Sequence, residues 1–122
     1  MLKPLPFEGT VKVINKGTDA VIVAGRPERD AALQAAKVCG VRGISTAVLE
    51  IPETEDADSR TFQYYSELAG VYVFSDRELY ERCRTLLSAS DRVGIAEHKD
   101  TESFERAVLA ARKIQEREKE KC

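Results

Sequence analysis

One pattern occurs three times in this chain: DAVIVAG (residues 19–25), GVYVFSD (residues 70–76) and RVGIAEH (residues 92–98). Each stretch holds four or five mostly apolar residues with little alternation, which is typical of a strand buried on both faces. A polar residue that can begin a helix follows each run. Repeated strand-then-helix units predict a parallel sheet covered by helices, and such sheets bind ligands at the carboxyl ends of their strands.

Two further segments complete the predicted sheet. Residues 10–14 (TVKVI) alternate, as a strand with one partly exposed face does, and residues 15–17 (NKG) supply a turn before residues 20–24. We therefore expect the first two strands to form an N-terminal antiparallel hairpin. Residues 41–51 (VRGISTAVLEI) form another strand region, expected to run parallel to residues 20–24 and to be most buried at residues 47–49.

Helical patterns separate these strands. The first is rich in alanine and is followed by Gly40, which we expect to adopt the left-handed conformation that ends helices. Ser75 or Asp76 caps the third, and Ser75 with Glu78 has the spacing of a capping box. The predicted helices span residues 30–39, 61–69, 76–87 and 100–114. The elements together predict a single α/β domain over residues 1–122, a three-layer Rossmann-like fold with a mostly parallel, mixed sheet of about five strands.

Three segments lie outside this pattern. We expect an irregular lead-in over residues 1–9, an acidic loop over residues 52–60 and a charged helical tail over residues 115–122. The acidic loop has the oxygen ligands that Ca²⁺ prefers, but it lacks the Asp-x-Asp-x-Asp-Gly order of a calcium loop. We therefore interpret it as a solvated loop and expect no metal site and no cofactor.

The composition restricts the partners. Charged residues make up 33% of the chain, yet the formal net charge is only −2, so the chain lacks the basic field that duplex nucleic acid or an anionic membrane attracts. High charge with one Asn and no Trp is also found in thermophile proteins. No apolar stretch reaches the roughly 20 residues of a membrane span, and the N-terminus lacks the apolar core of a signal peptide. These features predict a cytoplasmic protein.

The chain has three cysteines, Cys39, Cys83 and Cys122, which lie far apart and form no CxxC pair. They therefore predict neither a disulfide framework nor a metal site. Cys39 and Cys83 fall on the apolar faces of predicted helices, where a free thiol behaves as a small hydrophobic side chain.

The strand ends supply the candidate binding residues. Gly25 and Arg26 begin a helix, whose unpaired N–H groups and partial positive charge favour an anion such as phosphate. Arg29 adds a second forked donor. The turn has neither the three glycines of G-x-G-x-x-G nor the Gly-Lys-Ser/Thr of a P-loop, so the pattern predicts only a small anion or nucleotide. The predicted ligand-binding residues are Gly25, Arg26, Arg29, Ser75 and Asp76, with Ser45 and Thr46 as further candidates at the same edge.

A catalytic alternative uses the only histidine. His98, with Glu97 or Asp76 to orient it, would act as a general acid or base on a phosphorylated or nucleotide substrate. No nucleophile with a recognisable motif accompanies this histidine, since Ser75 lacks the flanking glycines of a nucleophile elbow. We therefore favour a reading without catalytic residues and keep the small enzyme as the second hypothesis.

Residues 19–44 (DAVIVAGRPERDAALQAAKVCGVRGI) resemble the DRTGG domain, a small α/β module. The similarity lies in the order of apolar strand, Gly, turn with Arg and Asp, alanine-rich helix and Gly-Ile. It implies a non-catalytic regulatory or assembly role with dimer contacts. The family's Thr-Gly-Gly is replaced by Ser45-Thr46-Ala47, so no site residue is carried over.

These observations together predict a non-catalytic binding or regulatory module. We expect it to self-associate, as a homodimer, and to bind a small anionic ligand or nucleotide at the carboxyl ends of its strands.

Overall fold

The computed structural model describes residues 11–51, 59–88, 91–96, 98 and 100–120. The strands lie in one sheet in the order β1-β3-β2-β4-β5, in which β1 is antiparallel to β3 and every other pair of neighbours is parallel. The predicted mostly parallel, mixed sheet is therefore confirmed. The elements are β1 (Lys12–Asn15), β2 (Ala20–Ala24), η1 (Arg26–Glu28), α1 (Arg29–Val41), β3 (Thr46–Glu50), α2 (Ser59–Leu68), β4 (Val71–Phe74), α3 (Arg77–Cys83), η2 (Arg84–Leu86), β5 (Arg92–Ile95) and α4 (Thr101–Glu120).

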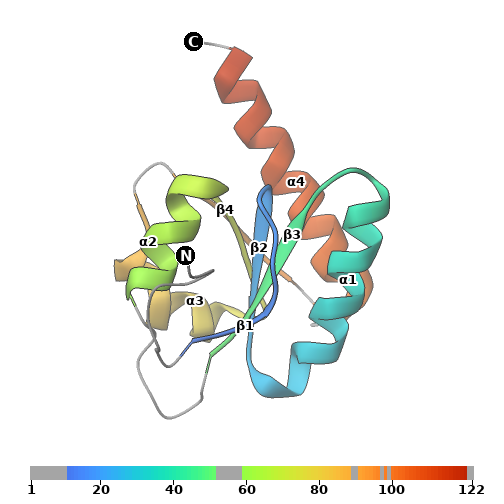
Figure 1. Cartoon of the computed structure of the whole chain (residues 1–122), viewed down its shortest axis with the longest axis vertical. Helices are drawn as coiled ribbons and strands as arrows, with labels where there is room; N and C mark the ends of the chain where they lie inside the picture. The colour runs from blue at the N-terminus through green and yellow to red at the C-terminus, as the bar shows by residue number, and fades with distance from the viewer. Residues whose placement is uncertain (1–10, 52–58, 89–90, 97, 99, 121–122) are drawn as a thin grey trace, which may run out of the picture.

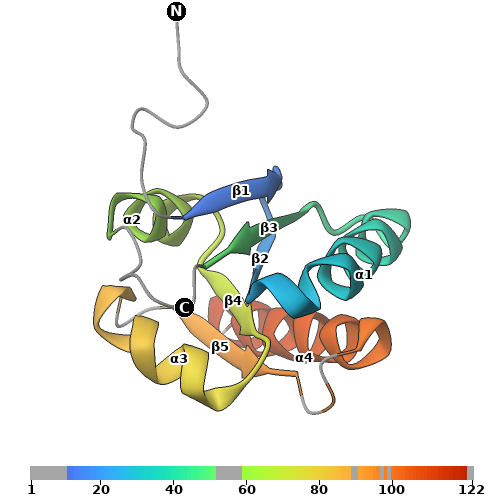
Figure 2. The same ribbon diagram turned by 90° about the horizontal axis from the view of Figure 1, so that it is seen from below.

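Helices cover both faces of the sheet (Figure 1), which gives the three predicted layers of an α/β fold. Figure 2 shows α1 and α4 on one face and α2 and α3 on the other. None of the described helices combines the length and the apolar composition that crossing a membrane requires.

Small side chains bring the helices close to the first face. Ala32 and Ala35 of α1 are fully buried, so the helix backbone lies near the strands. A Cβ atom on Gly94 of β5 would lie 3.3 Å from the carbonyl oxygen of Ala107, so α4 also approaches its strand closely. The alanine-rich pattern of the sequence therefore has the packing consequence expected of it.

Large rings fill the other face. Tyr72 stacks on Phe62 and on Phe74, with ring centroids 5.5 Å and 6.2 Å apart. Cys83 lies in this core and Cys39 in the opposite one, both buried as predicted. Burial raises the pKa of the Cys83 thiol to about 11.

The predicted N-terminal hairpin is wrong, because β3 lies between β1 and β2. β2 is buried along its whole length and takes a parallel strand on each side, whereas β1 has an exposed face and occupies the edge. The chain between them crosses the beginning of β3, where the Asn15 side chain donates to the carbonyl oxygen of Thr46 at 2.9 Å. Contact there is so close that a Cβ on Gly17 would lie 2.3 Å from the backbone nitrogen of Ala47.

A glycine in the left-handed conformation follows each of the helices α1 and α2. The prediction that Gly40 ends the first helix is wrong, since α1 continues to Val41 and the left-handed residue is Gly43, with φ 84°. The N–H of Ile44 reaches back to the carbonyl of Cys39 at 2.9 Å and closes this end. Gly70, with φ 71°, follows α2 as predicted.

Some predicted segments differ from the structure or lie beyond it. The apolar run of β5 is only partly buried, because this strand is at an edge of the sheet. The lead-in and residues 52–58 of the acidic loop lie outside the described residues, and residues 59–60 belong to α2. Of the predicted charged tail, residues 115–120 continue α4.

Candidate functional site

The carboxyl ends of β2, β3, β4 and β5 lie side by side at one edge of the sheet. Hydrogen bonds continue one residue beyond the strands, from the N–H groups of Ile51, Ser75 and Ala96 to carbonyl oxygens of the neighbouring strand, at 3.0, 3.0 and 2.9 Å. The segments after β2 and β4 carry all the predicted ligand-binding residues. The topology therefore brings these segments together, as expected for parallel strands.

Gly25 and Arg26 make the turn after β2. The Gly25 carbonyl accepts the N–H of Glu28 at 3.1 Å, which begins η1. Arg26 is exposed, and its guanidinium makes no ion pair or hydrogen bond to another described residue. A carboxylate oxygen of Glu28 lies 3.6 Å from the point where a Cβ on Gly25 would stand. The Glu28 carboxylate therefore places negative charge beside Gly25. Arg26 is the group at this turn that can bind an anion.

Arg29 is engaged by a residue that the sequence analysis missed. Its Nη1 lies 3.4 Å from Oε1 of Glu50, the last residue of β3, whose side chain is only 8% exposed. Asp30 is a second, exposed partner at 3.9 Å. Arg29 therefore neutralises a buried carboxylate. A signal was available in part: Glu50 is the one charged residue of β3, and a buried carboxylate needs a partner, but the sequence does not indicate which cation supplies it.

Ser75 and Asp76 have structural environments. The Asp76 carboxylate accepts the N–H of Leu79 at 2.8 Å and caps α3. Of the two predicted caps, Asp76 is therefore the one found, and the capping box expected for Ser75 and Glu78 is wrong. Ser75 is fully buried, and its Oγ has no hydrogen-bond partner among the described residues. Ser75 therefore offers no exposed group to a ligand, whereas Asp76 is half-buried.

His98, the central residue of the catalytic alternative, lies at the same edge, after β5. His98 is exposed, and Glu97 lies outside the described residues. Asp100 caps α4 by accepting the N–H of Ser103 at 2.8 Å. That hydrogen bond, with the Ser103 hydroxyl and then the charges of His98 and Arg106, lowers the pKa of Asp100. His98 is therefore close enough to a carboxylate to feel its charge, but that carboxylate belongs to a helix cap.

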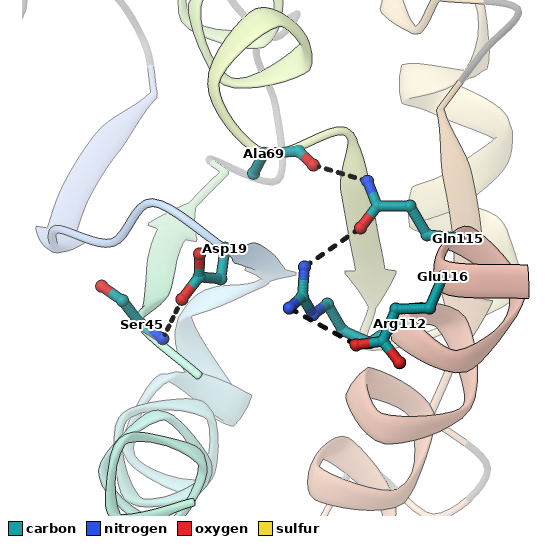
Figure 3. A network of polar contacts seen from close by, with 6 residues as sticks. All are labelled: Asp19, Ser45, Ala69, Arg112, Gln115 and Glu116. Atoms are coloured by element: carbon teal, nitrogen blue, oxygen red, sulfur yellow. Dashed lines mark hydrogen bonds and ion pairs between the residues drawn. The ribbon is translucent and has the colours of Figure 1, made fainter. Parts of the chain in front are cut away.

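The further candidates Ser45 and Thr46 lie at the opposite, amino edge of the sheet, since they precede and begin β3. The backbone N–H of Ser45 donates to Oδ2 of Asp19 at 2.8 Å (Figure 3). The Thr18 N–H in turn donates to Oγ of Ser45 at 3.2 Å. Their predicted place was wrong because the strand begins later than the apolar pattern indicated.

Helix α4 reaches the same amino edge (Figure 3). Gln115 donates from Nε2 to the carbonyl oxygen of Ala69 at 2.9 Å, and Arg112 donates from Nη1 to Oε1 of Gln115 at 3.1 Å. Glu116 stands 3.7 Å from the Arg112 guanidinium. These contacts fasten the beginning of α4's last turns to the end of α2.

Asp91 is a buried carboxylate at the amino edge, with 8% of its surface exposed. Its Oδ2 accepts the hydroxyl of Ser66 and the backbone N–H of Ser88, each at 2.7 Å. Ser66 also lies 3.1 Å from the Tyr72 hydroxyl, which donates to the carbonyl oxygen of Phe62 at 2.7 Å. Burial, the largest cause, raises the pKa of Tyr72.

Two cavities lie beside the helices, and the first reaches the carboxyl edge at Ile95 and Ser103. One of about 310 Å³ runs between β5 and α4 and is lined by Val93, Gly94 and Ala107 among others. One of about 540 Å³ lies between α2 and η2, with Ser66 and Leu86 in its wall. In the part of the chain that the structure describes, no three His, Cys, Asp or Glu side chains are grouped as a metal site requires.

Comparisons with known proteins bear on the fold. No protein-family model matches the chain, and no curated protein matches it either. A solved structure described as "Split gene transketolase, inactive beta4 tetramer" is similar, with a TM-score of 0.73 and 18% identity, over 89% of this chain and 44% of that one. This chain therefore spans less than half the length of that protein. The similarity shows that the α/β architecture described above occurs in a solved structure.

Proposed function

We propose that this chain is a non-catalytic binding module that self-associates and takes a small anionic ligand at the carboxyl edge of its sheet. The anion is a phosphate-bearing or carboxylate-bearing small molecule, with nucleotides among the candidates. The observation that carries the proposal is the contrast between two arginines: Arg29 is paired with Glu50, whereas Arg26 is exposed beside the end of β2 and unpaired among the described residues.

The position of Arg26 favours this role. It follows the central strand β2, and the segments after β3 and β4 are each one strand spacing away. A guanidinium presents a planar fork of donors that matches phosphate and carboxylate oxygens. The carboxylates of Glu28 and Glu50 stand nearby, so they limit the site to ligands small enough to be held mainly by Arg26.

The non-catalytic part rests on how the polar groups of this edge are used. Asp76 and Asp100 accept backbone N–H groups of their own helices, and Ser75 is buried. A carboxylate committed to a helix cap is a poor proton carrier, because releasing it uncovers the cap. The resemblance of residues 19–44 to the DRTGG domain implies the same kind of regulatory or assembly role.

Ligand-induced thermal stabilisation tests the anion site. Inorganic phosphate, nucleotides and sugar phosphates are screened, and a ligand present at 100 times its Kd should add about 2.7 kcal/mol of stability. Arg26→Ala should abolish the shift. Lys37→Ala is the matched control, because Lys37 is also exposed and cationic but lies two turns further along α1.

Two outcomes would overturn this proposal. A shift that survives Arg26→Ala places the anion elsewhere. Turnover of the ligand that disappears in His98→Ala contradicts the non-catalytic part and establishes the enzyme alternative. Light scattering after size exclusion tests self-association, and a monomer at high micromolar concentration would exclude it.

A further inference from the structure

The outer edge of β5 carries unpaired backbone groups. β5 ends the sheet, and the N–H groups of Arg92 and Ala96 point inward, to the carbonyl oxygens of Gly70 and Phe74, both at 2.9 Å. Alternate residues of a strand bond in opposite directions. The N–H and C=O groups of Val93 and Ile95 therefore face outward, and no described strand pairs with them.

An apolar groove follows this edge. Gly94 lets Ala107 of α4 lie close to the strand, and the resulting cavity of about 310 Å³ continues along the outer side of α4 past Ala110 and Ile114. Ile114 of α4 is 48% exposed, which is high for a large apolar residue, and Val93, whose side chain lies on the other face of β5, is 37% exposed. An exposed strand edge beside an apolar helix face is a surface that another chain can cover.

The other edge of the sheet differs. β1 is irregular, with a register shift between Val13 and Asn15, and its Lys12 is exposed. A bulge and a lysine are two of the devices by which edge strands resist pairing. Of the two edges, β5 is the one built to accept a strand.

We propose that a second copy of this chain docks on β5 around a two-fold axis at Gly94, so that the two sheets become one. This inference deepens the self-association proposed above and rests on it. Val93 pairs with Ile95 of the second copy through two backbone hydrogen bonds, and the reverse pair forms symmetrically. The two Gly94 residues then face each other as a non-hydrogen-bonded pair, about 4.5 Å apart at Cα, where side chains would be most crowded.

The spacing of the layers agrees with this arrangement. α4 lies over β4 and β5. Strands are spaced about 4.8 Å apart, so the axis of α4 stands about 5 Å from the two-fold axis. The two α4 helices are then about 10 Å apart, which is a contact distance for helices whose facing residues are small. Ala107 and Ala110 are the small residues on that side.

The charges of α4 favour an antiparallel second copy. Asp100 and Glu102 are exposed at its beginning, and Lys113 and Arg117 are exposed toward its end. Glu116, the described acidic residue between them, stands beside Arg112. A two-fold axis brings the acidic beginning of one helix beside the basic end of the other, at both ends of the pair. Arg106 is a further exposed cation in the wall of the groove, so the match lies in the net charge of the two halves of α4. This self-complementary pattern is what favours a second copy as the occupant.

Analytical ultracentrifugation of the full chain tests the interface. Ile114→Glu, at an already exposed position, should raise the dimer dissociation constant by at least about tenfold. Val41→Glu is the matched control, because Val41 is 90% exposed on α1, away from this face, and should leave the constant unchanged. Glu102→Lys should weaken the dimer severalfold, and adding Lys113→Glu should restore it, because an axis beside Ala107 places residue 102 of one α4 level with residues 112–113 of the other.

The outcomes separate the two proposals. A wild-type monomer overturns self-association and this interface together. A wild-type dimer that Ile114→Glu and Glu102→Lys leave unchanged keeps self-association and overturns only the β5 interface. Circular dichroism of each variant establishes that it is folded before its dissociation constant is compared.

Discussion

At the amino end of the sheet, several polar side chains join separate segments of the chain. At the carboxyl end two carboxylates cap the helices that follow them, and fewer contacts join separate segments: the Arg29–Glu50 pair, and the hydrogen bond from Thr101 Oγ1 to the carbonyl oxygen of Ala31. Asp19 holds the beginning of β3, Gln115 reaches from α4 to the end of α2, and Asp91 holds Ser66 and the loop at Ser88. At the carboxyl end, Asp76 and Asp100 are used locally.

This difference indicates which end of the sheet can bind a ligand. Buried polar groups that connect distant segments are costly to disturb, because each lost bond leaves an unsatisfied partner. Groups that only cap or face water are cheaper to reuse. The amino end is therefore expected to govern stability and the carboxyl end to govern ligand binding, with the Arg29–Glu50 pair as the stabilising contact of the second end.

The largest expected effect is at the amino end. Gly17→Ala places a Cβ 2.3 Å from the Ala47 backbone nitrogen, so β1 or β3 must shift. We expect a loss of about 3 kcal/mol in the free energy of unfolding, measured by urea denaturation. Gly40→Ala is the control, since nothing lies within 4 Å of its Cβ inside α1, and it should gain about 0.5–1 kcal/mol. Equal stability of the two variants would break the comparison.

Asp91→Ala removes the acceptor shared by Ser66 and Ser88. The expected loss is about 2 kcal/mol, because the Ser66 hydroxyl and the Ser88 N–H lose their partner at a half-buried position. Asp91→Asn keeps one acceptor oxygen and should recover about half of that loss. If urea midpoints show Asp91→Ala to be as stable as the wild type, the amino-end network does not hold the loop.

At the carboxyl end, Arg29→Ala leaves the Glu50 carboxylate buried without its cation. We expect a loss of about 1 kcal/mol, less than for a fully buried pair, since the Arg29 side chain is 41% exposed. Adding Glu50→Gln should return most of it. A double-mutant cycle measures the coupling, and independent effects of the two substitutions would show that the contact contributes nothing.

The two ends should also respond to opposite extremes of pH. The N–H of Ser103 lowers the pKa of Asp100, so the stability this group supplies is present above about pH 4 and is lost as the pH falls further. Burial raises the pKa of Tyr72, so its contribution is present below about pH 10 and is lost as the pH rises. Both effects should be small at neutral pH.

Two variants test which residue causes the loss of stability in acid and which causes the loss in base. Urea midpoints between pH 3 and 11 should decline less steeply in acid for Asp100→Asn and less steeply in base for Tyr72→Phe. Burial also raises the pKa values of Cys83 and Tyr65, so Tyr72→Phe should flatten the alkaline limb only in part. If Tyr72→Phe instead reduced the decline of the urea midpoint in acid, the assignment of the two groups would be wrong.

Local sequence patterns predicted where the strands and helices lie better than they predicted which strands pair with each other. The apolar runs at residues 20–24 and 71–74 are buried strands, and Gly70 ends α2, because a run of apolar residues or a glycine acts through its own segment. The hairpin failed because the pattern of β1 is compatible with any edge, and the contact that decides its partner is between Gly17 and β3.

The candidate site was predicted with similar limits. The carboxyl edge and Arg26 followed from strand direction alone, and both are where that argument put them. The engagement of Arg29 by Glu50 and the burial of Ser75 could not be predicted, since they depend on how α1 and β4 sit against β3 and β2. The role of Asp91 was hidden for the same reason.

By itself, the amino-acid sequence determined which segments are strands and helices and the direction in which the strands run, because hydrophobic period and helix caps act over a few residues. Only the tertiary structure decided that β3 separates β1 from β2, that Arg29 is bound to Glu50, and that the open edge is β5. Those outcomes depend on pairings between residues far apart in the chain, whose free energy is set by shape and burial after the layers have come together.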